Sequence, residues 1–130
     1  MNHSASSLAY IGDAVFELCV REMLLSAGNR PVNALNQMAL QYVTAKAQAK
    51  MYHAVVPFLS EEEENVLRRG RNLHSHSKAK SANMSEYRHA TGLETLFGYL
   101  YITGQKERLT EIFALCTKED EVQQNEDEEI

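Results

Sequence analysis

The chain has 130 residues and a formal net charge of −5 at pH 7. This length predicts one domain with a hydrophobic core, and only two prolines and six glycines favour helices. No run approaches the ~18 apolar residues of a membrane span, and Cys19 and Cys116 have no metal-ligand or disulfide spacing. We therefore expect a cytoplasmic all-α protein without a secretory signal and without a membrane partner.

The first predicted helix spans about 6–26 and contains an unusual polar position. Its expected core stripe follows helical spacing and consists of Leu8, Ile11, Val15, Leu18, Cys19 and Leu25. Asp13 interrupts the apolar run directly after Gly12. A desolvated carboxylate is costly unless it is compensated, and glycine in a helix costs about 1 kcal/mol relative to alanine. The pair predicts a functional site, and a helix that is apolar nearly all round predicts a central or subunit-shared position.

The next helices are marked by capping residues. A helical region over 31–57 is expected to divide at Thr44, a residue suited to an N-cap. Ser60 and Glu63 form a capping-box pattern that starts a short helix reaching about Arg71. The acidic run 61–64 is interpreted as partners of the helix macrodipole. The alternative interpretation is the acidic cluster of a metal-dependent nucleotide pyrophosphohydrolase.

Charge is distributed unevenly along the chain. Residues 118–130 contain seven acids and one lysine, whereas the segment 65–93 is basic. Six cations lie in that segment beside the single acid Glu86: Arg68, Arg69, Arg71, Lys78, Lys80 and Arg88. A concentration of this kind is what a phosphate-binding surface requires. The alternative is a solvated loop over 72–85 with incidental lysines.

A second acid appears in the following helix, expected over 86–102. Its core stripe is predicted to consist of Leu93, Leu96, Phe97, Leu100 and Tyr101. Glu94 lies at the edge of that stripe, near Gly98, which allows another helix to approach closely. A final helix is expected over 107–117, and the acidic tail 118–130 is expected to be disordered because it has little to bury.

Asp13 and Glu94 are thus two acids at the edges of apolar helices. Mg²⁺ prefers oxygen ligands and needs only one or two carboxylates beside water and substrate phosphates. Such an ion activates water and stabilises charge at a phosphodiester. The alternative is that both acids pair with arginine or lysine in a structural network.

Four ordered blocks resemble the ribonuclease III family, in particular the short bacterial branch called Mini-ribonuclease III. They are 8–17 (LAYIGDAVFE), 69–72 (RGRN), 87–91 (YRHAT) and 91–98 (TGLETLFG). The resemblance implies an all-α homodimer of about six helices per chain that cleaves double-stranded RNA with Mg²⁺ and leaves 5′-phosphates. It assigns Asp13 and Glu94 as the catalytic, metal-binding acids, and the large-subunit (23S) ribosomal RNA precursor as the substrate.

The sequence departs from the larger family members at two acidic positions, which here hold Ser6 and Thr91. The number of bound ions therefore stays open. Glu17, one turn after Asp13, is expected to pair with a basic residue across the dimer interface or to supply an outer oxygen.

The branch lacks a separate RNA-binding domain, so the catalytic body is expected to hold the duplex by its shape and phosphates. The predicted RNA-binding residues are Arg69, Arg71, Asn72, Lys78, Lys80 and Arg88. We expect a catalytic domain over 1–117 and an acidic tail over 118–130. The competing functions are a non-catalytic dimer that binds double-stranded RNA and the nucleotide pyrophosphohydrolase.

Overall fold

The structure, a computed structural model, describes residues 3–73 and 83–128, with side chains described as far as Lys118. Within these ranges it contains helices and no strand, so the predicted all-α class is confirmed. The elements are α1 (Ala5–Ala27), α2 (Val32–Val43), α3 (Ala45–Val55), the 3₁₀ turn η1 (Val56–Phe58), α4 (Glu61–Arg71), α5 (Met84–Ile102) and α6 (Lys106–Glu128). None of the helices so described is long and apolar enough to cross a membrane.

Hydroxyl side chains fix where three helices begin. Ser4 caps α1, slightly earlier than expected, because its Oγ accepts a hydrogen bond from the backbone N–H of Ser7 at 3.1 Å. Thr44 caps α3 as predicted, and its hydroxyl accepts the backbone N–H three residues on at 3.2 Å. Ser60 and Glu63 form the predicted reciprocal capping box at 2.9 and 3.2 Å.

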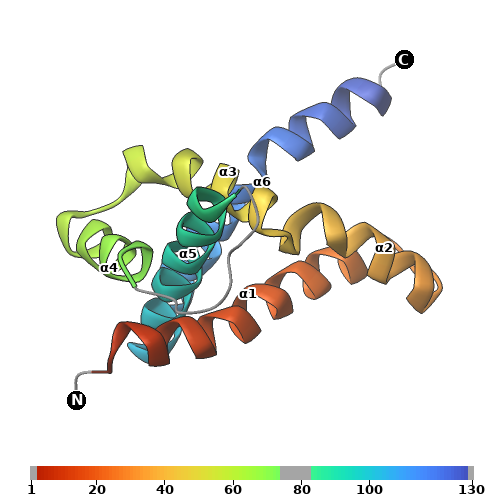
Figure 1. The fold of residues 1–130 in the computed structure, drawn as a ribbon. Helices are drawn as coiled ribbons and strands as arrows, with labels where there is room; N and C mark the ends of the chain where they lie inside the picture. The colour runs from red at the N-terminus through yellow and green to blue at the C-terminus, as the bar shows by residue number, and fades with distance from the viewer. Residues whose placement is uncertain (1–2, 74–82, 129–130) are drawn as a thin grey trace.

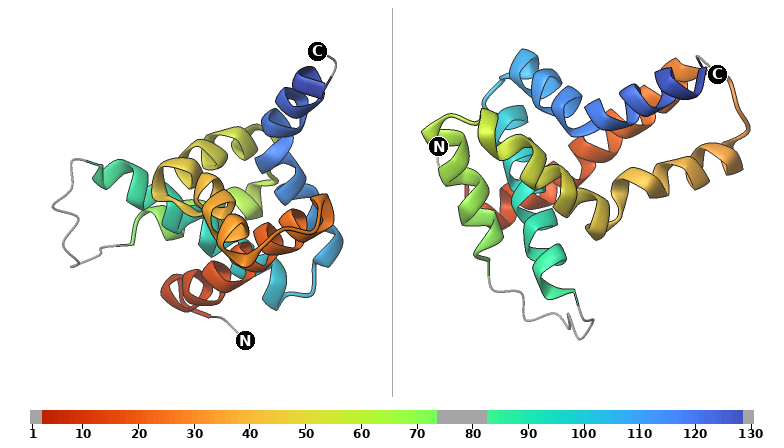
Figure 2. Two further views of the ribbon diagram at one scale, coloured as in Figure 1. Left: turned by 90° about the vertical axis from the view of Figure 1, so that its right-hand side faces the viewer. Right: turned by 90° about the horizontal axis from the view of Figure 1, so that it is seen from above.

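Helix α5 runs through the centre of the molecule, and α1, α3 and α4 all pack along it (Figures 1 and 2). Three phenylalanine rings connect α1, α5 and α6 in the core. The ring of Phe16 meets Phe97 edge-on at 5.2 Å and Phe113 at 6.0 Å. Edge-to-face pairs of this kind add about 0.5–1.5 kcal/mol beyond the area they bury. Helix α5 therefore contacts α1, α3, α4 and α6.

The predicted stripes are correct at most positions and wrong at three. Leu18 and Leu25 of α1 are 54% and 61% exposed, and Tyr101 of α5 is 47% exposed. Val20 and Leu24, on the other side of α1, are buried instead. Periodicity cannot choose between two apolar sides of one helix. The consequence is an apolar surface on α1 that this single chain leaves uncovered.

Two glycines bring α1 and α5 into direct backbone contact. A Cβ atom on Gly12 would overlap the carbonyl oxygen of Glu94, and one on Gly98 would overlap the carbonyl oxygen of Leu8. Because both obstacles are backbone atoms, no rotamer change relieves them. The crossing is therefore set by residues without side chains, with Asp13 directly beside it.

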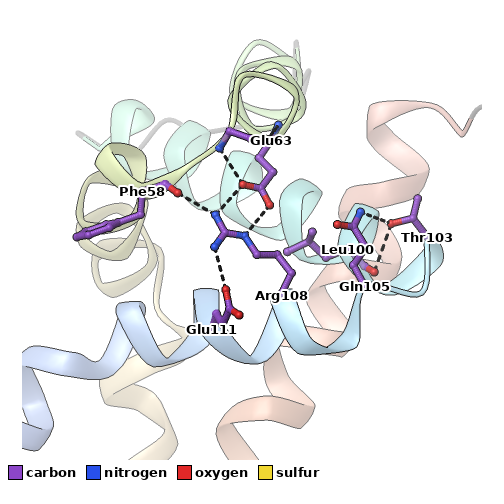
Figure 3. Close-up of polar contacts among 8 residues, drawn as sticks. Phe58, Glu63, Leu100, Thr103, Gln105, Arg108 and Glu111 are labelled. Carbon is purple, nitrogen blue, oxygen red and sulfur yellow. Dashed lines mark hydrogen bonds and ion pairs between the residues drawn. The ribbon is translucent and has the colours of Figure 1, made fainter.

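Arg108 of α6 anchors the beginning of α4 (Figure 3). Its guanidinium donates two hydrogen bonds of 2.8 Å to the carboxylate of Glu63, one of 2.8 Å to the carbonyl oxygen of Phe58 and one of 3.0 Å to Glu111. Hydrogen bonds from Arg108 are the main reason that the pKa of Glu63 lies below its usual range. The carboxylate of Glu63 thus serves the helix N-terminus and its packing, which agrees with the macrodipole interpretation of the run 61–64.

The C-terminal helix differs from the expected one. We expected it to end near Thr117, whereas α6 continues to Glu128. Glutamate, glutamine and lysine have high helix propensity, and extending a helix that already exists avoids the cost of nucleation. The division into a catalytic domain over 1–117 and a disordered acidic tail over 118–130 stays a prediction.

Gly12→Ala is expected to lower the free energy of unfolding by about 2–3 kcal/mol, because the added methyl group forces α1 and α5 apart. Urea or thermal unfolding measures the change. The control Ser26→Ala, at an exposed position of α1, should stay within about 0.5 kcal/mol of the wild type. Equal stability of Gly12→Ala and the wild type would refute the close contact.

Candidate functional site

The α1–α5 crossing brings Asp13 and Glu94 within hydrogen-bonding reach of each other. Asp13 follows Gly12 on α1 and is exposed, while Glu94 lies on α5 and is half-buried. The two acids are therefore neighbours in space, although 80 residues lie between them in the chain. We expected both acids to be partly buried; Glu94 is, whereas Asp13 is exposed.

The environment of Glu94 keeps its carboxyl group protonated at neutral pH. Burial raises the pKa of Glu94 to about 8, with a further contribution from the hydrogen bond and the negative charge of Asp13. Within the described ranges, neither acid forms an ion pair with a lysine or an arginine. Among the residues that the structure describes, Asp13 and Glu94 therefore pair with each other and not in a structural Arg/Lys network.

This donor set fits a divalent cation. Two carboxyl groups that share a proton offer oxygen ligands, and a cation that replaces the proton relieves their repulsion. In the part of the chain with described side chains, no three or more His, Cys, Asp or Glu side chains are arranged so that they could hold a metal ion. Two protein ligands are enough for Mg²⁺, which keeps several water molecules and binds substrate phosphates.

Both acids line an open cleft of about 750 Å³ between α1, α5 and the α2–α3 junction. Thr91 also lines this cleft, but its hydroxyl donates to the carbonyl oxygen of Tyr87 at 3.0 Å. Ser6 is exposed in the first turn of α1 and is not part of the lining. The two positions that hold acids in larger family members therefore supply no carboxylate here.

Glu17 faces the same cleft but has a partner within its own helix. Its carboxylate accepts a hydrogen bond from Arg21, one turn later on α1, at 2.9 Å. Within this single chain Glu17 thus pairs locally, and pairing across a subunit interface stays a prediction. An exposed pair at this spacing contributes little to stability.

Three of the predicted RNA-binding residues gather around a second, basic cavity. Arg71 and Asn72 at the end of α4 and Arg88 on α5 line a pocket of about 320 Å³. Arg69 is exposed on α4 but does not line it. Lys78 and Lys80 lie outside the described residues. Helix α5 thus lines the acidic cleft with one side of its first turns and the basic pocket with another.

Sequence reasoning missed a group of aromatic and imidazole rings beside that pocket. The hydroxyl of Tyr52 accepts a hydrogen bond from Arg71 at 3.3 Å. The ring of His89 lies 4.5 Å from that of Tyr52 and 4.7 Å from that of His53. Arg88, a predicted RNA-binding residue directly before His89, could have indicated His89 from the sequence. No local sequence pattern indicates that the end of α3 packs against α5.

Comparisons with known proteins agree with these features. The Ribonuclease III domain family model matches residues 6–105. Mini-ribonuclease 3 of Enterococcus faecalis is 49% identical over 114 residues, which cover 86% of each chain. Mini-ribonuclease 3 of Symbiobacterium thermophilum is 52% identical over 106 residues and 82% of each chain. A crystal structure of a Fusobacterium nucleatum protein superposes with a TM-score of 0.79 at 30% identity and covers 90% of both chains.

Asp13→Asn is expected to lower the pKa of Glu94 from about 8 toward the ordinary value of ~4.3, while burial keeps it above that value. An NMR titration of the metal-free protein measures the change. Because the pKa of Glu94 is raised in the folded protein, the free energy of unfolding should fall as the pH rises from 4.5 to about 8. This fall should be smaller in Asp13→Asn.

Glu17→Gln is the matched control for this titration, because its carboxylate pairs with Arg21 and is not a cause of the shift in Glu94. An unchanged Glu94 titration in Asp13→Asn would contradict the assigned pair, as would an equal shift in the control.

Proposed function

Because the chain belongs to the ribonuclease III family and is an endoribonuclease for double-stranded RNA, we propose that Mg²⁺ is its cofactor and that it matures the large-subunit (23S) ribosomal RNA precursor. The observation that carries the metal assignment is the Asp13–Glu94 pair, two carboxyl groups in an open cleft without a cationic partner among the described residues. We place the reaction in the cytoplasm.

Asp13 and Glu94 hold the metal in this proposal. A divalent cation in the cleft supplies charge stabilisation at the scissile phosphate and lowers the pKa of water. Glu94 must lose its proton before it becomes a ligand, so metal binding releases a proton and strengthens as the pH rises. Thr91 and Ser6 leave the site with two acids, so water and RNA phosphate oxygens complete the coordination.

The basic pocket holds the duplex. Arg71 and Arg88 present guanidinium groups at the pocket, and Asn72 adds an amide. Arginine binds phosphate with two parallel donors. Together with Arg69, Lys78 and Lys80 these residues form the proposed RNA-binding set, which recognises the backbone of the A-form duplex.

We further propose that the enzyme acts as a homodimer through the uncovered apolar face of α1 and α2. Tyr10, Leu18 and Leu25 on α1 and Val32 on α2 are 84%, 54%, 61% and 69% exposed. Exposed large apolar side chains that recur along α1 and at the start of α2 are typical of an interaction site. A symmetric dimer covers the face with its own copy.

Purified protein is expected to cleave a long RNA duplex with Mg²⁺ and to stop when a chelator is added. Asp13→Asn and Glu94→Gln should each lower the cleavage rate by about a thousandfold or more, because each removes a metal ligand worth several kcal/mol at the transition state. A gel assay with an end-labelled duplex measures the rates, and Glu17→Gln is the control that keeps its activity.

The same preparation separates the competing functions. Tight duplex binding by the wild type without any cleavage would support the non-catalytic dimer. Hydrolysis of nucleoside triphosphates in place of RNA would support the pyrophosphohydrolase. If Asp13→Asn and Glu94→Gln both cleave RNA at the rate of the wild type, the site assignment is contradicted.

The dimer has its own test. Sedimentation equilibrium should give a dimer for the wild type and a monomer for Leu18→Glu, since the substitution introduces a charge into the apolar face. Phe58→Glu, at a 56% exposed position of η1 away from this face, should remain a dimer. A monomeric wild type at micromolar concentration would refute the proposal.

A further inference from the structure

His89 forms part of the wall of the basic pocket, beside Arg88 and across from Arg71. Its ring is held edge-on against Tyr52, which is 4% exposed, at a centroid distance of 4.5 Å and an interplanar angle of 89°. His53 of α3 lies against it at 4.7 Å. These contacts fix the imidazole at the pocket, so its position does not depend on a ligand.

One hydrogen bond determines which nitrogen of His89 titrates. Nδ1 lies 2.6 Å from the carbonyl oxygen of Ser85, one turn earlier on α5. A carbonyl oxygen only accepts hydrogen bonds, so Nδ1 carries a proton in both charge states of the ring. Nε2 is therefore the nitrogen that gains or loses a proton. It is an acceptor in the neutral ring and a donor in the charged one.

The same tyrosine also orients an arginine of the pocket. The Tyr52 hydroxyl accepts from Nη1 of Arg71 at 3.3 Å, and the Asn72 side-chain oxygen accepts from Nε of Arg71 at 3.3 Å. The guanidinium and the imidazole are thus both positioned by one buried ring. A group placed in advance loses less conformational freedom when it binds a phosphate.

Charged and titratable side chains surround His89 in the basic pocket. Arg71 on α4 and Arg88 on α5 are cations at the pocket, and His53 is a second imidazole on α3. Glu86, half-buried on α5, is the acid of that helix nearest in sequence, and Tyr52 completes the ring contacts. An RNA phosphate bound among these groups would add a negative charge beside the imidazole.

We propose that His89 is a phosphate-binding residue of the basic pocket, which donates from Nε2 to a phosphodiester oxygen of double-stranded RNA only when the ring is protonated. RNA binding then takes up a proton, and the duplex is held more tightly at acidic than at alkaline pH. The inference rests on the proposed role of this pocket in RNA binding.

Equilibrium binding of a duplex RNA in EDTA, at constant ionic strength and between pH 6 and 8, tests the proposal. The wild type is expected to bind at least about fivefold more tightly at pH 6 than at pH 8, since one linked proton changes the affinity by up to about tenfold per pH unit. At pH 6 the slope of log K against log salt should also be steeper by about one unit, as for one more phosphate contact.

Three variants give the matched comparisons. His89→Gln is expected to bind weakly at both pH values, and His89→Arg, which keeps a charge throughout, is expected to bind tightly at both. His3→Gln removes an imidazole that precedes α1 and lines neither cavity, so it should follow the wild type. Circular dichroism confirms that each variant is folded.

Two results would overturn the inference. If the wild type binds RNA and His89→Gln retains the same dependence on pH, the pocket works without a proton on His89. If the wild type binds no duplex at either pH, the proposed function fails, and this inference fails with it.

Discussion

The contact between α1 and α5 at two glycines is the constraint on which the rest of the structure depends. Gly12 lies against the backbone of Glu94, and Gly98 lies against the backbone of Leu8. At this crossing the side chain of Asp13, next to Gly12, lies within hydrogen-bonding reach of Glu94. A glycine and an acid inside an apolar helix are each unfavourable. Both are explained here by contact with Glu94 of α5.

A single helix, α5, joins the two parts of the proposed site. Glu94 and Thr91 line the acidic cleft, and Arg88 and His89 line the basic pocket one or two turns earlier. A rigid helix fixes the spacing between the proposed metal-binding acid and the proposed phosphate-binding cations without help from loops. Arg108 and Glu63 secure α4, which supplies Arg71 to the pocket. The two cavities are thus parts of one rigid arrangement.

Much of the fold follows from local sequence patterns. The capping box at Ser60 and the N-cap at Thr44 act within one helical turn, and both were predictable. The outward orientation of Leu18 was not predictable, because α1 is apolar on two sides and only tertiary packing decides which is buried. The association of Asp13 with Glu94 came from family resemblance, whereas that of Tyr52 with His89 joins distant segments and left no local signal.

The central claim is that the glycine contact places Asp13 and Glu94 together as the ligands of one divalent cation. A crystal of the protein soaked in Mn²⁺, which replaces Mg²⁺ at oxygen sites, tests it through anomalous scattering. We predict a peak within about 2.0–2.4 Å of a carboxylate oxygen from each residue. A peak bound elsewhere, or no peak in the cleft at a concentration that supports cleavage, would contradict it.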